Sequence, residues 1–174
     1  LLFGNRFAKI LVKGDATNFM NSHCYVIGYP IVKQENIHHS FNNNVLITLQ
    51  FTHDHSDKEN TILLNELKVF VSSVDTKVNF YLKHHPRFNN EVDLSEILDL
   101  PNTHFAPDDI NECFKFCSVH ATTYSTSTFE AALLGIPTIL IYSQNAFNFF
   151  KTDFIYPLNY DISDFKDITV YQKS

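Results

Sequence analysis

From residue 44 onward, short apolar runs alternate with longer stretches in which apolar residues recur every three or four positions. Continuous apolar runs of five or six residues are typical of strands that are buried on both faces of a parallel sheet. The pattern therefore predicts four strands, at residues 45–49, 78–83, 119–123 and 137–142.

The segments between these runs have the spacing of helices. Ser56 and Glu59 stand three positions apart, as in a capping box, and the sequence after them puts apolar residues on one helical face: Leu63, Leu67, Phe70, Val71 and Val74. Asp109 and Glu112 repeat the capping-box spacing before a second helix that reaches Phe116, and a third helix is predicted over residues 128–134. Strands that alternate with helices in this way predict an α/β fold, a Rossmann-like parallel sheet in three layers.

Residues 1–40 have a different organisation. They contain a short β-rich run at 9–15, a possible short helix at 16–22 and a second β-rich run at 24–30. The polar stretch that follows, at 34–44, reads as a linker. We therefore predict a lead-in segment over 1–40 and one Rossmann-like domain over 41–174.

Composition excludes several classes of protein. The 174 residues are 44% hydrophobic and 14% aromatic, which rules out a disordered chain. A formal net charge of −6 without a basic block gives no support to nucleic-acid binding. Three cysteines are an odd number, and the start of the chain has no signal-peptide pattern, so we expect a reduced, cytoplasmic setting. The absence of an initial Met leads us to expect a fragment of a longer protein.

Three segments that follow predicted strands carry chemically useful side chains: 50–57, 84–87 and 124–128. In open α/β sheets, ligands bind beyond the carboxyl ends of the strands. The loop at Ser125, Thr126 and Ser127 is rich in hydroxyl groups and runs into a helix, where unpaired backbone N–H groups would suit a phosphate. Glu130, one turn later, would reach a ribose. The alternative is that Ser127 and Glu130, which have capping-box spacing, only begin the helix.

His85 lies between a predicted strand end and a proline, which keeps its backbone extended. Its imidazolium would pair with a phosphate oxygen, and Arg87 would add positive charge. The alternative is an ordinary histidine of a surface loop.

Two other groups of residues are weaker candidates. His53, His55 and Asp57 imitate the beginning of a binuclear metallo-hydrolase motif, but Lys58 replaces its last histidine, so we predict no metal site and read this segment as a polar loop before a helix cap. Cys113 and Cys117 share one helical face and are expected to be buried structural thiols. The chain has no nucleophile elbow, Walker loop or dinucleotide fingerprint.

Two motifs carry a resemblance to a known family. The first is Lys83-His84-His85-Pro86, and the second runs from Tyr124 through Ser125-Thr126-Ser127-Thr128-Phe129-Glu130 to Gly135-Ile136-Pro137. Together they resemble the donor-binding half of GT-B glycosyltransferases, with bacterial sialyl-, polysialyl-, capsule and teichoic-acid transferases as the nearest similar enzymes. The resemblance covers residues 9–145.

The resemblance implies a metal-independent transferase without a cofactor, whose donor is a CMP-, UDP- or CDP-linked sugar. It implies that His85 is a catalytic residue on the donor phosphate, that Ser125 and Thr126 bind the same group, and that Glu130 holds the ribose. A saccharide or lipid-linked acceptor and the general base would belong to an N-terminal half outside this chain. Such enzymes build bacterial surface polysaccharides, and the full-length protein would associate peripherally with the membrane.

Two alternatives stay open. UDP-N-acetylglucosamine 2-epimerases share the loop, the Glu-Ala pair and the Gly-x-Pro pattern, but they carry a His-Arg-x-Glu-Asn run where this chain has Thr52-His53-Asp54-His55. The other alternative is a non-catalytic binding module with a sugar-nucleotide fold. Nucleotide binding would distinguish both enzymes from that module.

Overall fold

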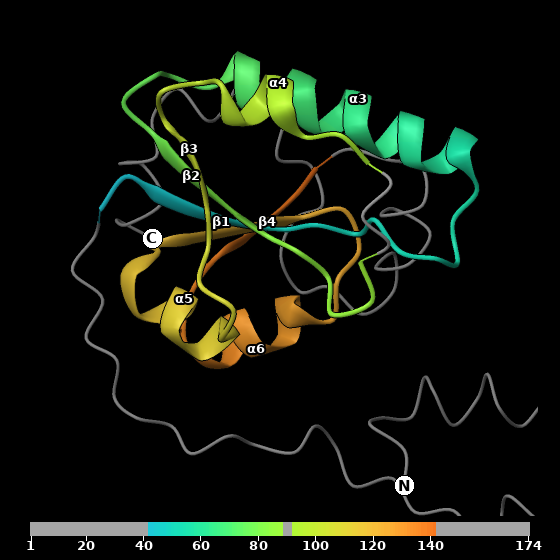
Figure 1. Ribbon diagram of the computed structural model, residues 1–174. Helices are drawn as coiled ribbons and strands as arrows, with labels where there is room; N and C mark the ends of the chain where they lie inside the picture. The colour runs from blue at the N-terminus through green and yellow to red at the C-terminus, as the bar shows by residue number, and fades with distance from the viewer. Residues whose placement is uncertain (1–41, 89–91, 142–174) are drawn as a thin grey trace, which may run out of the picture. The chain divides into compact units, whose positions relative to one another are not determined.

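The structure is a computed structural model that describes residues 42–88 and 92–141 (Figure 1). These residues belong to the predicted Rossmann-like domain. The predicted lead-in at 1–40, with its two β-rich runs and its short helix, lies outside the described residues, and so does the end of the predicted strand at 137–142.

A five-stranded parallel sheet forms the centre of the domain, with the strand order β3-β2-β1-β4-β5. The strands are β1 (Asn44–Thr48), β2 (Asn79–Lys83), β3 (Thr103–Phe105), β4 (Val119–Thr122) and β5 (Thr138–Leu140). Val45 of β1 is in register with Phe80 of β2 on one side and with Val119 of β4 on the other. The predicted α/β fold with a parallel, Rossmann-like sheet is confirmed, and each of the four predicted strands is present with slightly shifted ends.

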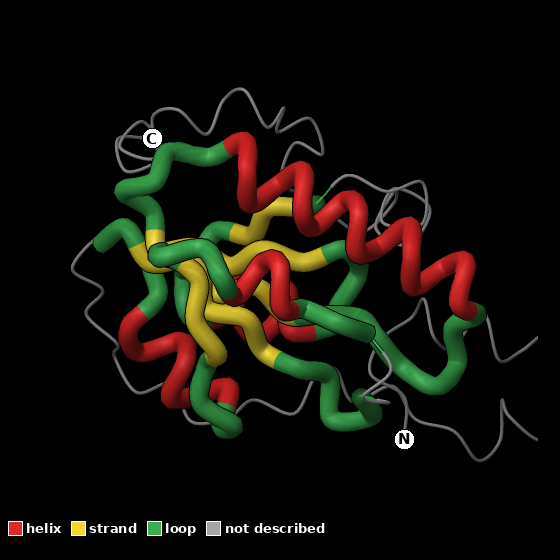
Figure 2. The backbone as a smooth tube through the Cα atoms, turned by 45° about the horizontal axis from the view of Figure 1, so that its top comes forward, coloured by secondary structure: helices red, strands yellow, loops and turns green. Residues whose placement is uncertain are grey.

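Helices cover both faces of the sheet, which gives the three layers (Figures 1 and 2). The long helix α3 (Asp57–Ser73) and the short α4 (Ser95–Leu98) lie on one side, and α5 (Ile110–Phe116) and α6 (Ser127–Leu133) lie on the other. The predicted capping box of α3 is confirmed, because the side chain of Ser56 accepts from the Glu59 N–H and the Glu59 carboxylate accepts from the Ser56 N–H at 2.8 Å.

The two faces of the sheet differ in the size of the apolar cluster that covers them and in the number of buried polar side chains. Val45 and Ile47 of β1 pack with α3 in the larger apolar cluster, whereas Leu46 packs with Phe114 and Ala131 in a smaller one. Successive side chains of a strand alternate between faces, so Thr48 lies on the side of Leu46. On that same side, buried polar residues of β4 and β5 take positions that apolar residues would otherwise fill: His120, Thr122 and Thr138. The α5/α6 face therefore combines a small apolar cluster with a polar region.

Several local predictions need correction. β3 and α4, which have three and four residues, were not predicted from the sequence. Asp109 caps α5 as predicted, but its side chain accepts from the Asn111 N–H at 2.8 Å. Glu112 pairs instead with Lys115 one turn later, so the predicted reciprocal box is wrong. No helix within residues 42–88 and 92–141 has both the length and the apolar character needed to cross a membrane.

Candidate functional site

The strand order creates a switch point between β1 and β4. From β1 the chain proceeds outward through α3 to β2 and β3, and it then returns to β4 and continues through α6 to β5 on the other side. The loops that follow β1 and β4 therefore leave the sheet toward opposite faces. In open α/β sheets the crevice formed in this way, at the carboxyl ends of the strands, is where ligands bind.

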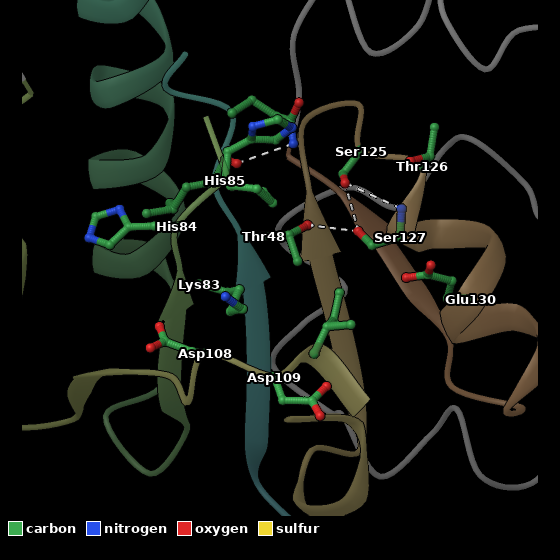
Figure 3. A pocket seen from close by; sticks show the side chains of 14 residues that line it. Thr48, Lys83, His84, His85, Asp108, Asp109, Ser125, Thr126, Ser127 and Glu130 are labelled. Carbon is green, nitrogen blue, oxygen red and sulfur yellow. Dashed lines mark hydrogen bonds between the residues drawn. The ribbon is translucent and has the colours of Figure 1, made fainter. Parts of the chain in front are cut away.

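A cleft of about 400 Å³ opens at this switch point. Four segments line it, one after each of the strands β1 to β4: Thr48–Gln50, Lys83–Pro86, Asp108–Ile110, and Ser125–Ser127 with Glu130. Figure 3 shows Thr48 between two walls, with Lys83, His84 and His85 on the side of β2 and the serine and threonine hydroxyls on the side of α6. Segments that are about forty residues apart in the sequence thus line one cleft.

The cleft contains five of the six predicted site residues: His85, Ser125, Thr126, Ser127 and Glu130. Arg87 is the exception. It does not line the cleft, its side chain is largely exposed, and its guanidinium forms an ion pair with Asp54 at 2.7 Å. The prediction that Arg87 adds charge at the phosphate position is therefore not supported, because the loop turns after Pro86 and directs Arg87 toward Asp54.

The loop before α6 also differs from the prediction, which required unpaired backbone N–H groups. The N–H groups of Thr128 and Phe129 donate to the carbonyls of Ser125 and Thr126, at 3.3 Å and 3.0 Å. The N–H of Ser127 donates to the Ser125 hydroxyl, and the N–H of Ser125 donates to the Thr122 hydroxyl. These four amides are already satisfied inside the loop, so they do not provide the unpaired N–H groups that the prediction required.

The alternative that Ser127 and Glu130 begin the helix agrees with the position of Ser127, but Ser127 is not the N-cap. The helix begins at Ser127 with Thr126 as N-cap, and the Thr126 side chain makes no capping hydrogen bond. Ser127 is therefore the first helical residue and not the cap. Its hydroxyl is buried and bonds to Thr48, His120 and Ser125. The serine is part of a polar network that continues into the sheet.

His85 presents a neutral ring to the cleft. Its Nδ1 accepts the Arg87 backbone N–H at 3.1 Å, so the proton of the neutral ring is on Nε2. Burial, and secondarily the positive charge of Arg87, lower the pKa of His85. The expected imidazolium is therefore replaced by a neutral Nε2–H donor at neutral pH.

His120, which was not among the predicted site residues, lies directly behind the cleft and bonds to two residues that line it. It lies in β4, is fully buried, and burial lowers its pKa to about 3. Its Nε2 lies 2.9 Å from Thr48 Oγ1 and 3.2 Å from Ser127 Oγ, and its Nδ1 lies 3.0 Å from Thr138 Oγ1. A neutral ring thus connects two hydroxyls that line the cleft with a third on β5. A lone histidine in a strand offers no sequence signal for this, because its partners come from two other strands and from α6.

Charged side chains of both signs surround the cleft. Lys83, the last residue of β2, contributes the positive charge on the β2 side. Asp108 and Asp109, at the beginning of α5, contribute carboxylates that Figure 3 shows near Lys83 and away from the hydroxyls of Ser125 and Ser127. Lys83, which belongs to the Lys83-His84-His85-Pro86 motif but had no predicted role, thus places a positive charge in the cleft.

The segment that resembled a metal motif has other partners. His55 Nε2 bonds to the Tyr124 hydroxyl at 2.6 Å, and Asp54 pairs with Arg87. Within the described part of the chain, no group of three histidine, cysteine or acidic side chains could hold a metal ion. Cys113 and Cys117 are buried as predicted, and burial raises the pKa of the Cys117 thiol to about 12. That thiol is not a nucleophile at neutral pH.

Comparison of the chain with protein-family models, with curated proteins and with solved structures gave no match.

Proposed function

We propose that this domain is the donor-binding half of a metal-independent glycosyltransferase of GT-B architecture, which uses a nucleotide-activated sugar. The observation that carries the proposal is the cleft at the switch point, where His85 and the Ser125–Ser127 loop face each other with Glu130 beside them. Both motifs that carry the resemblance thus contribute residues to the cleft.

The donors in the cleft suit the chemistry of sugar transfer. When the bond from the sugar to the phosphate breaks, negative charge develops on the departing phosphate, and donors held in position stabilise it without reorganisation. His85 Nε2–H, the hydroxyls of Ser125 and Thr126, and the Lys83 ammonium are the donors proposed to do this. Glu130 is proposed to accept hydrogen bonds from the ribose.

A complete transferase needs two further components. The acceptor, a saccharide or a lipid-linked saccharide, and the general base that deprotonates it are proposed to belong to a second half outside this chain. Peripheral attachment to a membrane would also come from that half. This domain alone is then expected to bind donor nucleotides but not to turn them over.

A thermal-shift panel with CMP, CDP, UMP and UDP tests the binding step. A nucleotide present at 100 times its dissociation constant is expected to stabilise the domain by about 2.7 kcal/mol. His85→Ala should reduce the shift. Arg87→Ala is the matched control, because it alters the same loop outside the cleft and keeps the backbone N–H that His85 uses.

The outcomes separate the candidate functions. If none of the four nucleotides stabilises the wild-type domain, the donor-binding proposal is wrong. If a nucleotide binds, product analysis on a protein that also contains the acceptor-binding half distinguishes sugar transfer from epimerisation. Binding without either reaction would indicate a non-catalytic module.

A further inference from the structure

A chain of hydrogen bonds runs from β5 through the sheet to the cleft. It begins at the Thr138 hydroxyl, passes through both nitrogens of His120 and reaches the Thr48 and Ser127 hydroxyls. Thr48 Oγ1 lies 3.1 Å from Ser127 Oγ, which lies 2.7 Å from Ser125 Oγ. His120 has no solvent exposure, and its ring packs edge-on against Phe114. The network therefore has a fixed geometry, and what varies is the direction of its protons.

Ser125, the last member of this network on the side of the cleft, sets the direction of the protons. Ser125 Oγ accepts the Ser127 N–H at 3.3 Å and the Ser127 O–H at 2.7 Å. Since a hydroxyl has two acceptor sites and one donor, Ser125 is left with its own O–H to donate. Ser125 lines the cleft, so this proton is available to a ligand.

The proton positions at Ser127 and Thr48 indicate which nitrogen of His120 has the proton. The single proton of the Ser127 hydroxyl is used on Ser125, so Ser127 can only accept from Thr48 and His120. If His120 Nε2 lacked a proton, it would take the Thr48 proton, and neither contact with Ser127 would contain a hydrogen. With the proton on Nε2, Thr48 donates to Ser127, and the Nε2–H points between the Thr48 and Ser127 oxygens, so two protons serve these three contacts instead of one. Nδ1 then accepts from the Thr138 hydroxyl.

We propose that His120 is a positioning residue of the phosphate site: Thr138 holds its neutral ring as the Nε2–H tautomer, and the ring directs the hydroxyl protons of Thr48, Ser127 and Ser125 toward an anion in the cleft. The inference rests on the proposed function, since it concerns the same cleft. Aligned hydrogen bonds polarise one another, so a ligand anion that accepts from the Ser125 O–H favours the order in which each hydroxyl donates toward the cleft. With the protons in the opposite order, the Ser125 oxygen would face the anion as an acceptor, which disfavours binding. Neither His120 nor Thr138 lines the cleft.

Two substitutions on β5 test the proposal without altering the cleft. Thr138→Val keeps the shape of the side chain and removes the O–H that donates to Nδ1, whereas Thr138→Ser keeps that donor and is the matched control. Long-range ¹H–¹⁵N NMR spectra report which nitrogen of a neutral histidine has the proton. We expect Nε2–H in the wild type and in Thr138→Ser, and a mixture of both tautomers in Thr138→Val.

The binding measurement uses inorganic phosphate, titrated into the 174-residue chain and followed through the backbone amides of residues 125–127. Thr138→Val is expected to bind phosphate about five- to tenfold more weakly than the wild type, which corresponds to about one neutral hydrogen bond. Thr138→Ser should stay within about twofold of the wild type. All titrations are made at a temperature where each variant is fully folded, so that a change in stability alone does not alter the affinity.

Different results overturn different statements. If the wild type does not bind phosphate at all, the inference fails, whereas the proposed function fails only if the four nucleotides do not bind either. If the wild type binds phosphate and Thr138→Val binds it equally well, only the role of His120 is wrong. A wild-type spectrum with the proton on Nδ1 has the same consequence.

Discussion

Acid should destabilise this domain through His120. The imidazole has no exposure to solvent and an ordinary pKa near 6.5 in an unfolded chain, while burial lowers its pKa to about 3 in the folded one. Between pH 3 and pH 6.5, His120 is therefore protonated in the unfolded state and neutral in the folded state. The contribution of His120 to stability is therefore complete above pH 6.5 and is lost as the pH falls toward 3.

The size of the loss follows from the two pKa values. Each pH unit within this window costs about 1.4 kcal/mol, so a change from pH 7 to pH 5 should remove about 2 kcal/mol from the free energy of unfolding. That is a large part of the 5–15 kcal/mol that a domain typically has. His84 and His85 have lowered pKa values for the same first cause, burial, and they act in the same direction.

One carboxyl group opposes them. Burial raises the pKa of Glu66 to about 7, so this side chain takes up a proton on folding and loses stability as the pH rises. The wild-type pH profile alone therefore mixes opposite effects. The difference between the wild type and His120→Gln at each pH isolates His120, because the other groups titrate in both proteins.

Urea unfolding at pH 5, 6 and 7 provides the measurement. The glutamine amide does not titrate, so the free-energy difference between the two proteins should shrink by about 2 kcal/mol from pH 7 to pH 5. A constant difference over this range would refute the buried, neutral state of His120. If His120→Gln does not fold, an NMR titration of wild-type His120 gives the same answer, since the ring should stay neutral until the domain unfolds.

Three further predictions concern single side chains. His85→Ala, in a protein that also contains the acceptor-binding half, should lower kcat more than it weakens donor binding, by about 2.7–4 kcal/mol of transition-state stabilisation; unchanged steady-state kinetics would remove His85 from the mechanism. Glu130→Gln should raise KM for the donor about tenfold with kcat nearly unchanged, since one ribose hydrogen bond weakens, whereas a silent variant would indicate a role in the helix only. Glu66 Oε2 is buried without a hydrogen-bond partner, and the wild type should lose stability as this carboxyl group ionises. In urea unfolding, the free energy of unfolding of Glu66→Gln relative to the wild type should therefore rise by about 1 kcal/mol from pH 6 to pH 8. A fall of this difference over the same range would mean that the carboxylate is stabilised as an anion.

The sequence predicted the fold well wherever a continuous apolar run met a capping signal. β1 and β4 are buried along nearly their whole length, β2 has buried residues at alternate positions, and α3 has both an apolar face and a capping box. β3 was missed because it has three residues, of which only Thr103 is buried. Such a strand is defined by its pairing with β2, which sequence periodicity does not reveal.

The site was predicted in part for the same reason. The rule that ligands bind at the carboxyl ends of strands brought His85 and the serine-rich loop together, because both stand at predicted strand ends. The 85–88 turn, in which the Phe88 N–H donates to the His85 carbonyl, takes Arg87 away toward Asp54, and the sequence did not reveal its direction. The hydrogen bonds of His120 to Thr48 and Thr138 depend on the register between β1, β4 and β5, so the sequence of β4 alone does not reveal them.

The strand order has a consequence for the synthesis of the chain. β1 lies in the middle of the sheet, but its neighbour β4 follows more than seventy residues later in the sequence. Until β4 leaves the ribosome, one edge of β1 lacks its pairing strand, and its central residues Val45, Leu46 and Ile47 are all apolar. Unpaired apolar edges are where nascent chains pair with one another and aggregate. Slow translation or truncation before residue 119 should therefore lower the soluble yield, whereas an interruption after β4 should be better tolerated.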